Sequence, residues 1–97
     1  MTIRETPKKP ARCELVGSKW MIENITETKE ITAELNQTVY VVGCIGATIV
    51  IHKKCKNLIV DGCKKTVVVF DKCMSSVEVV NCKYVMMMMM MKYLCFA

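Results

Sequence analysis

The fold is decided by three consecutive rows of equal length, which read VYVVGCIGATIVIHKKCKN (39–57), LIVDGCKKTVVVFDKCMSS (58–76) and VEVVNCKYVMMMMMMKYLC (77–95). Written beneath one another, the rows place Cys44, Cys63 and Cys82 in one column of a 19-residue frame. A fourth row fits upstream and begins with WMIENI at Trp20. A fixed period of this length is the signature of a stacked architecture, so the columns carry the evidence for the fold.

Two apolar columns lie two residues apart, which is the spacing of one strand face. They consist of Trp20, Val39, Leu58 and Val77, and of Ile22, Val41, Val60 and Val79. The column between them is mixed and is predicted to face outward; it holds Met21, Tyr40, Ile59 and Glu78. A further column contains only asparagine and glycine, at Asn24, Gly43, Gly62 and Asn81. Both residue types accept a positive φ at low cost, so each row is predicted to bend there.

A second strand follows each bend, with Ala47, Ile49 and Ile51 predicted to stack on Thr66, Val68 and Phe70. β-branched residues dominate these segments, which favours strands over helices. Short strands with regular turns are also typical of an antiparallel sandwich. The sandwich fold does not explain why glycine or asparagine followed by cysteine recurs every 19 residues. We therefore predict an all-β, right-handed parallel β-helix of about 19 residues per coil, in which like residues stack about 4.8 Å apart.

The 97-residue length allows one domain, and no run of 18 apolar residues predicts a transmembrane helix. Residues 1–12 are basic, contain two prolines and have no apolar signal core, which predicts an extended arm and an intracellular protein. Residues 13–85 are predicted to form the coils. Residues 86–97 contain a run of six methionines and an aberrant tail, so the β-helix is expected to be incomplete at this end.

The net charge of +5 is concentrated in residues 39–97, which contain eight lysines and only three acidic residues. In the 19-residue frame Lys64 lies over Lys83, and Lys53 lies over Lys72. Like charges on neighbouring strands repel, so such ladders are consistent with a binding face for an acidic partner. The alternatives are a solvated lysine-rich face and protection of sheet edges against aggregation.

The chain has seven cysteines, an odd number, and is expected to keep them as reduced thiols. Their spacing lacks a Cys-x-x-Cys knuckle and His52 is the only histidine, so no metal site is predicted. Disulfides within an in-register ladder are disfavoured because paired Cβ atoms stand about 4.8 Å apart. The thiols are predicted to be small core residues.

No catalytic group can be assembled from the acidic residues, because Asp61, Asp71 and Glu78 fall in three different columns. We therefore predict a binding scaffold without enzymatic activity and without a cofactor. Nucleic-acid binding is not expected either, because no aromatic residues interleave the lysines.

Four stretches resemble the C-terminal β-helix domain of the adenylyl cyclase-associated protein family. They read CELVGSKWMIEN (13–24), TVYVVGC (38–44), TIVIHKKCKNLIVDGCKKTVVVFD (48–71) and SVEVVN (76–81). The family pattern contains Gly-x-Lys-Trp, Asp-x-Cys-Lys-Lys and Val-Phe-Asp motifs in this order. It has Lys-Gly-Lys where this chain has His52-Lys53-Lys54. We place the end of the resemblance near Val85.

The resemblance implies binding of monomeric actin, with preference for its ADP form, promotion of nucleotide exchange and a cytoplasmic place with the actin cytoskeleton. It also implies adenylyl cyclase as a possible partner. The family domain continues for further coils and ends in a strand that pairs two subunits, which is expected to be missing here. The actin-binding face is predicted to consist of Lys53, Lys54, Lys64, Lys65, Lys72 and Lys83. Of these, Lys54, Lys64 and Lys65 match family positions.

Two other interpretations remain open at this point. One is a domain like tubulin cofactor C, a β-helix relative that stimulates a GTPase. That activity needs an arginine presented to phosphates, and the only arginines are Arg4 and Arg12. The other is a nonfunctional fragment that keeps the signature of the fold.

Overall fold

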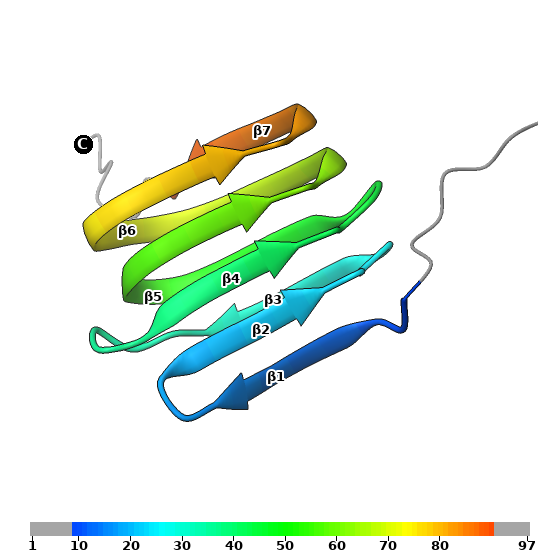
Figure 1. The fold of residues 1–97 in the computed structure, drawn as a ribbon. Coiled ribbons are helices and arrows are strands. Elements are labelled where there is room, and N and C mark those ends of the chain that lie inside the picture. Colours follow the sequence, from blue (N-terminus) through cyan, green and yellow to red (C-terminus); the bar gives the residue numbers. More distant parts are fainter. Residues whose placement is uncertain (1–8, 91–97) are drawn as a thin grey trace, which may run out of the picture.

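The computed structural model describes residues 9–90 and contains seven strands in one coiled sheet (Figure 1). In chain order the strands are β1 (Arg12–Val16), β2 (Lys19–Glu23), β3 (Thr28–Thr32), β4 (Thr38–Val42), β5 (Thr48–Asp61), β6 (Lys64–Val80) and β7 (Lys83–Met89). All pairings after β2 are parallel. The predicted parallel β-helix is therefore confirmed. Residues 9–90 contain no helix that could span a bilayer.

The two apolar columns pair as the 19-residue frame predicts. Trp20 pairs with Val39, Val39 with Leu58 and Leu58 with Val77. In the middle rows these side chains have no exposed surface, whereas Val77 in the last row is 43% exposed. Burial of apolar surface between the two strand layers is thus the main stabilising contribution, and it falls off at the last row.

The predicted bends lie at the asparagine and glycine column. All four residues have a positive φ, from 52° at Asn81 to 65° at Gly43. Gly43 has a second constraint, because a Cβ atom there would lie 2.6 Å from Oδ1 of Asn24 in the preceding row. The backbone N–H of Gly43 donates to the carbonyl of Asp61, and that of Gly62 donates to the carbonyl of Val80. The bend therefore also links each row to the next.

The second strand of each row also has the predicted register. Ile49 pairs with Val68 and Ile51 pairs with Phe70, and all four side chains are buried. Thr66 is fully buried in this layer, and its hydroxyl donates to the carbonyl of Lys64 at 2.9 Å. A buried hydroxyl therefore has an acceptor in its own strand.

The two corners of each row differ in construction. At the glycine corner the chain leaves one strand and enters another, whereas at the opposite corner β5 and β6 continue as bent strands (Figure 1). Register shifts occur in β5 on both sides of the segment that contains Lys54 and Cys55. Cys55 within this segment pairs with Cys73, whereas Ile51 before it pairs with Phe70. Paired residues are thus 18 positions apart in the sequence inside this segment and 19 positions apart before it. Such bulges bend a strand without ending its pairing.

The first row is covered by a strand that the 19-residue frame does not predict. β1 runs antiparallel to β2, and a two-residue turn at Gly17 and Ser18 joins them. Trp20, the first residue of its apolar column, is partly buried and pairs with Leu15 of β1. Its indole N–H donates to Oε1 of Gln37 at 2.9 Å. The edge of the first row is therefore protected by a hairpin.

Methionines continue the last row as part of β7. Met86 to Met89 pair with residues 67–70 of β6. Met87 packs against the core, while Met86 is 58% exposed and Met88 47% exposed. A methionine run can therefore occupy a strand position here, although its lack of alternation places apolar side chains in water.

Because burial in one column falls from row to row, the same type of truncation should have different effects at Leu58 and Val77. We expect Leu58→Ala to lower the free energy of unfolding by about 2–5 kcal/mol, because it leaves a cavity in a fully buried site. Val77→Ala should lower it by less than about 1 kcal/mol, because Val77 is 43% exposed. Urea denaturation followed by circular dichroism measures both, and equal losses would contradict the assigned register.

Candidate functional site

The six predicted site lysines lie at the two corners and do not form one continuous face. Lys64, Lys65 and Lys83 follow the glycine corner, and we call them the glycine-corner lysines. Lys53, Lys54 and Lys72 lie where β5 and β6 bend, and we call them the opposite-corner lysines. The two corners stand at opposite ends of the strands (Figure 1). Six strand residues span about 20 Å, so one small acidic group cannot contact both sets.

The glycine-corner lysines surround one shallow depression. Lys64 pairs with Lys83 in the parallel register, as predicted. The depression has a volume of about 250 Å³ and is lined by these two residues, Lys65 and Tyr84. No carboxylate is among its lining residues. Asp61 ends β5 just before this corner, and its Oδ1 accepts a hydrogen bond from Asn81 at 3.3 Å.

The backbone at this corner has a second column of positive φ angles. Gly46 has a φ of 64°, Lys65 of 50° and Tyr84 of 56°. The three occupy the same position in the 19-residue frame, so these three rows make the same turn. The left-handed conformation is unfavourable for a residue with a Cβ by roughly 1–2 kcal/mol. Lys65 and Tyr84 therefore project from a strained turn that glycine occupies in the row before.

The predicted stacking of Lys53 over Lys72 is wrong, because Lys72 pairs with Lys54. Lys53 has a φ of 65° and stands in the bulge, where β5 has one residue more than β6. This extra residue shortens the local offset by one and brings Lys54 into register. The ladder of like charges exists, but it is displaced by one residue.

The opposite-corner lysines share their surroundings with acidic and apolar residues. An open depression of about 640 Å³ is lined by Glu34, Leu35, Asp71, Lys53, Lys54, Ala33 and Asn36. Leu35 is 59% exposed on the turn closed by the Gln37 N–H and the carbonyl of Glu34. Carboxylates here reduce the positive potential that the lysines create. The glycine corner is therefore the more basic of the two.

The acidic residues considered as catalytic candidates do not come together. Asp61 ends β5 at the glycine corner, and Asp71 lines the depression at the opposite corner. Glu78 is exposed on β6. Within residues 9–90 no group of three or more histidine, cysteine, aspartate or glutamate side chains could hold a metal ion.

The cysteine column lies in the core, as predicted. Cys44 and Cys63 are fully buried, and Cys82 is partly buried against them. The Cys63 thiol donates to the carbonyl of Val41 at 3.5 Å. Contact with Cys44 and burial raise the pKa of Cys63, and burial raises the pKa of Cys82. Cys63 and Cys82 are therefore protonated at neutral pH.

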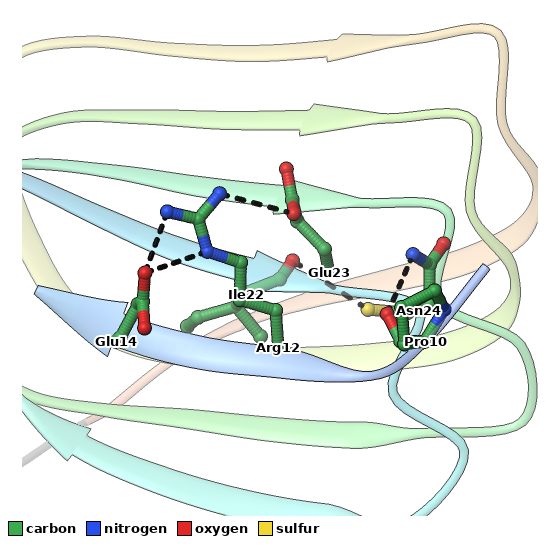
Figure 2. Close-up of polar contacts among 7 residues, drawn as sticks. Pro10, Arg12, Glu14, Ile22, Glu23 and Asn24 are labelled. Carbon is green, nitrogen blue, oxygen red and sulfur yellow. Dashed lines mark hydrogen bonds and ion pairs between the residues drawn. The ribbon is translucent and has the colours of Figure 1, made fainter. Parts of the chain in front are cut away.

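Of the two arginines that a GTPase-stimulating domain could present, Arg4 lies outside the described residues and Arg12 is held by carboxylates. Arg12 begins β1, and its Nη2 lies 2.6 Å from Oε1 of Glu14 (Figure 2). Its Nη1 lies 3.5 Å from Oε1 of Glu23 on β2 (Figure 2). Asn24 beside them donates to the carbonyl of Pro10 at 3.1 Å (Figure 2). Both sides of the guanidinium thus face carboxylates, which leaves it poorly placed to contact a phosphate.

The fold and these corners define the class of the protein: it is a parallel β-helix with lysine ladders at its turns. The sequence model of one family, described as adenylate cyclase associated (CAP) C terminal, matches residues 9–94. The match extends through the methionine run, past Val85, where we placed the end of the resemblance. The chain therefore belongs to the family of the adenylyl cyclase-associated protein C-terminal domain.

Curated relatives agree with this family. The adenylyl cyclase-associated protein of Dictyostelium discoideum is 42% identical over 81 residues, which are 80% of this chain and 18% of the relative. Human adenylyl cyclase-associated protein 1 is 38% identical over 92 residues, 92% of this chain and 19% of the relative. The protein of Schizosaccharomyces pombe is 35% identical over 79 residues, 78% of this chain and 14% of the relative. The chain thus spans less than a fifth of each of these relatives.

Lysine-to-glycine substitutions at positions of positive φ distinguish the effect of backbone strain on stability from the effect of the lysine side chain. Lys65→Gly should leave the free energy of unfolding unchanged or raise it by up to about 1 kcal/mol, because relief of the positive φ exceeds the extra entropy of glycine in the unfolded chain. Lys53→Gly should behave in the same way, since Lys53 also has a positive φ. Thermal unfolding measures both. A loss of more than about 1 kcal/mol in either variant would show that the lysine side chain stabilises its corner.

Proposed function

We propose that the chain is an actin-monomer-binding module of the cyclase-associated protein type, and that the glycine-corner lysines make its main contact. It favours the ADP form of actin and promotes nucleotide exchange by binding, without catalysis of its own. The observation that carries this proposal is the depression lined by Lys64, Lys65, Lys83 and Tyr84, which has three ammonium groups and no carboxylate among its lining residues.

The physical argument concerns charge repulsion within the ladder. Lys64 and Lys83 are direct partners on neighbouring strands, so their ammonium groups repel each other in the unbound protein. An acidic surface of a partner relieves this repulsion as it docks. Such a contact also speeds association at low ionic strength, because the positive corner attracts the partner at long range. The proposed binding should therefore weaken as salt increases.

The opposite corner supports a different part of the same proposal. Its depression combines the exposed Leu35 with Lys53 and Lys54, and Glu34 and Asp71 lie beside them. Mixed polarity of this kind suits the rim of a protein interface better than its charged centre. We therefore assign the opposite-corner lysines a secondary role in the contact with actin.

The setting of this activity follows from the family. We propose that the chain acts in the cytoplasm with the actin cytoskeleton. The names of its relatives associate those proteins with adenylyl cyclase, and a link to the cyclase is proposed here for the whole protein only. The chain corresponds to a small part of such a protein.

A triple variant tests whether the lysines bind actin at all. We expect the wild-type chain to be retained by immobilised ADP-actin monomers at low salt. Replacement of Lys54, Lys64 and Lys65 by glutamate should lower this retention at least tenfold, because three attractive contacts become repulsive. Circular dichroism checks that the variant folds. No retention of the wild-type chain, or retention that the variant does not change, would overturn the proposal.

Two single variants decide which corner makes the main contact. Lys65→Gly and Lys53→Gly each remove one ammonium group from a position of positive φ, so both keep or improve the backbone. Lys65→Gly should weaken binding of ADP-actin monomers about three- to tenfold, and Lys53→Gly by less than about twofold. Fluorescence titration with labelled actin measures both dissociation constants. The reverse order would place the main contact at the opposite corner.

A further inference from the structure

One pair of thiols differs from the cysteine column in this protein. Cys55 and Cys73 are register partners on β5 and β6, and their Sγ atoms lie 3.4 Å apart. In a regular ladder the strands stand about 4.8 Å apart and paired side chains point the same way. The sulfur atoms are closer than this spacing, so the two side chains lean toward each other. Both residues lie where the register shifts have bent the strands.

The cysteine column at the glycine corner shows the contrasting arrangement. There the thiols donate to carbonyl groups: Cys63 to Val41 at 3.5 Å, and Cys82 to Val80 at 3.1 Å. Their sulfur atoms are thereby directed at the backbone. Cys63 also contacts the thiol of Cys44, but both of these thiols have carbonyl acceptors, whereas the hydrogen bond of Cys55 and Cys73 joins the two thiols to each other. The Cys55–Cys73 pair therefore differs from the cysteine column both in its place, at the bulged corner, and in the hydrogen bonds of its thiols.

We propose that Cys55 and Cys73 are a disulfide-forming site that joins two neighbouring coils when the protein meets a small-molecule disulfide. A disulfide requires sulfur atoms at about 2.05 Å, so the pair at 3.4 Å must approach by about 1.4 Å. The Cα separation expected for paired strands, about 4.8 Å, already lies within the range found in disulfides. Rotation about the side-chain bonds at this bent corner therefore supplies most of the movement.

The chemistry balances as two successive thiol–disulfide exchanges. The thiolate of Cys73 attacks oxidised glutathione, forms a mixed disulfide and releases one glutathione thiolate. The thiolate of Cys55 then attacks the Cys73 sulfur and releases the second glutathione thiolate. The protein loses two electrons and two protons, and the reagent becomes two molecules of reduced glutathione. Cys73 reacts first because it is partly exposed, whereas Cys55 is 1% exposed.

Burial limits the rate of this reaction. Burial and the contact with Cys55 raise the pKa of Cys73 to about 12, and burial raises the pKa of Cys55. Only the thiolate attacks a disulfide, so the rate should rise about tenfold for each unit of pH between 7 and 10. The pair is thus slow to oxidise at neutral pH.

The bond would act directly on the opposite-corner lysines. Lys54 and Lys72 are paired one residue before the two cysteines. A disulfide between Cys55 and Cys73 would hold these lysines together against their repulsion and fix the bulged segment. The site itself is independent of actin binding, and its test contains no actin.

Mass spectrometry of the oxidised 97-residue chain tests the proposal. The protein is incubated with oxidised glutathione at pH 8.5, alkylated and digested with trypsin and with an enzyme that cleaves after glutamate. Cleavage at Glu78 separates Cys73 from Cys82, and cleavage at Lys56 separates Cys55 from Cys63. We expect a peptide that links Cys55 to Cys73, with Cys63 and Cys82 recovered in alkylated form. The oxidised protein should also have a Tm higher by at least about 5 °C.

Matched variants complete the test. Cys82→Ser removes a partly exposed thiol from the other column and should leave the linked peptide unchanged, while Cys73→Ser should abolish it and the rise in Tm. Recovery of Cys73 only as an alkylated thiol or a stable mixed disulfide would overturn the proposal. A bridge between Cys63 and Cys82 in the wild-type chain would overturn it as well. Both of these outcomes are read from the wild-type protein, so they do not depend on the folding of a variant.

Discussion

The structure depends on one backbone constraint, which is the left-handed turn at the same place in every row. Asn24, Gly43, Gly62 and Asn81 all adopt a positive φ there. This turn recurs every 19 residues. Each strand that follows it therefore lies one coil further along the β-helix and pairs in parallel with the equivalent strand of the preceding coil. Stacked apolar columns follow from that register, and so does the burial that stabilises the domain. The corner thus determines both the shape of the coil and the composition of the core.

The regular parts of the fold could be predicted from the sequence because a repeated turn and a repeated strand leave the same residue types at the same offset. The register of Trp20, Val39, Leu58 and Val77 is of this kind. Departures from the period could not be predicted. β3 pairs with β5 one position out of the period, with Thr28 opposite Thr48, and β1 runs antiparallel through a tight turn at Gly17. The 19-residue frame gives the wrong register for β3 and assigns no place to β1.

The candidate site shows the same limit. The pairing of Lys64 with Lys83 was predicted because both follow the glycine corner at a fixed distance. Lys53 was placed over Lys72 because the frame has no bulge, yet the structure pairs Lys54 with Lys72. One clue was present in the sequence: the related family has glycine where this chain has Lys53. A glycine at that position is the sign of a positive φ, and Lys53 has a φ of 65°.

The division of the lysines between two corners is what the sequence could not show, because columns alone do not reveal which of them share a face of the coil. In the structure the corners carry residues of different character. The glycine corner has lysines and a tyrosine around its depression, and the opposite corner mixes lysines with Glu34, Asp71 and Leu35. Turns therefore serve two purposes in this fold. They fix the register between neighbouring coils, and they expose lysine and tyrosine side chains at the corners, outside the packed core.

The central claim is that successive rows pair in parallel in the 19-residue register. Nuclear Overhauser contacts between backbone protons of the isotope-labelled chain test it most directly. The structure predicts contacts between Val41 and Val60 and between Ile49 and Val68, in the pattern of parallel strands. Contacts between Hα atoms of directly opposed residues in these segments, which are typical of antiparallel pairs, would contradict the account.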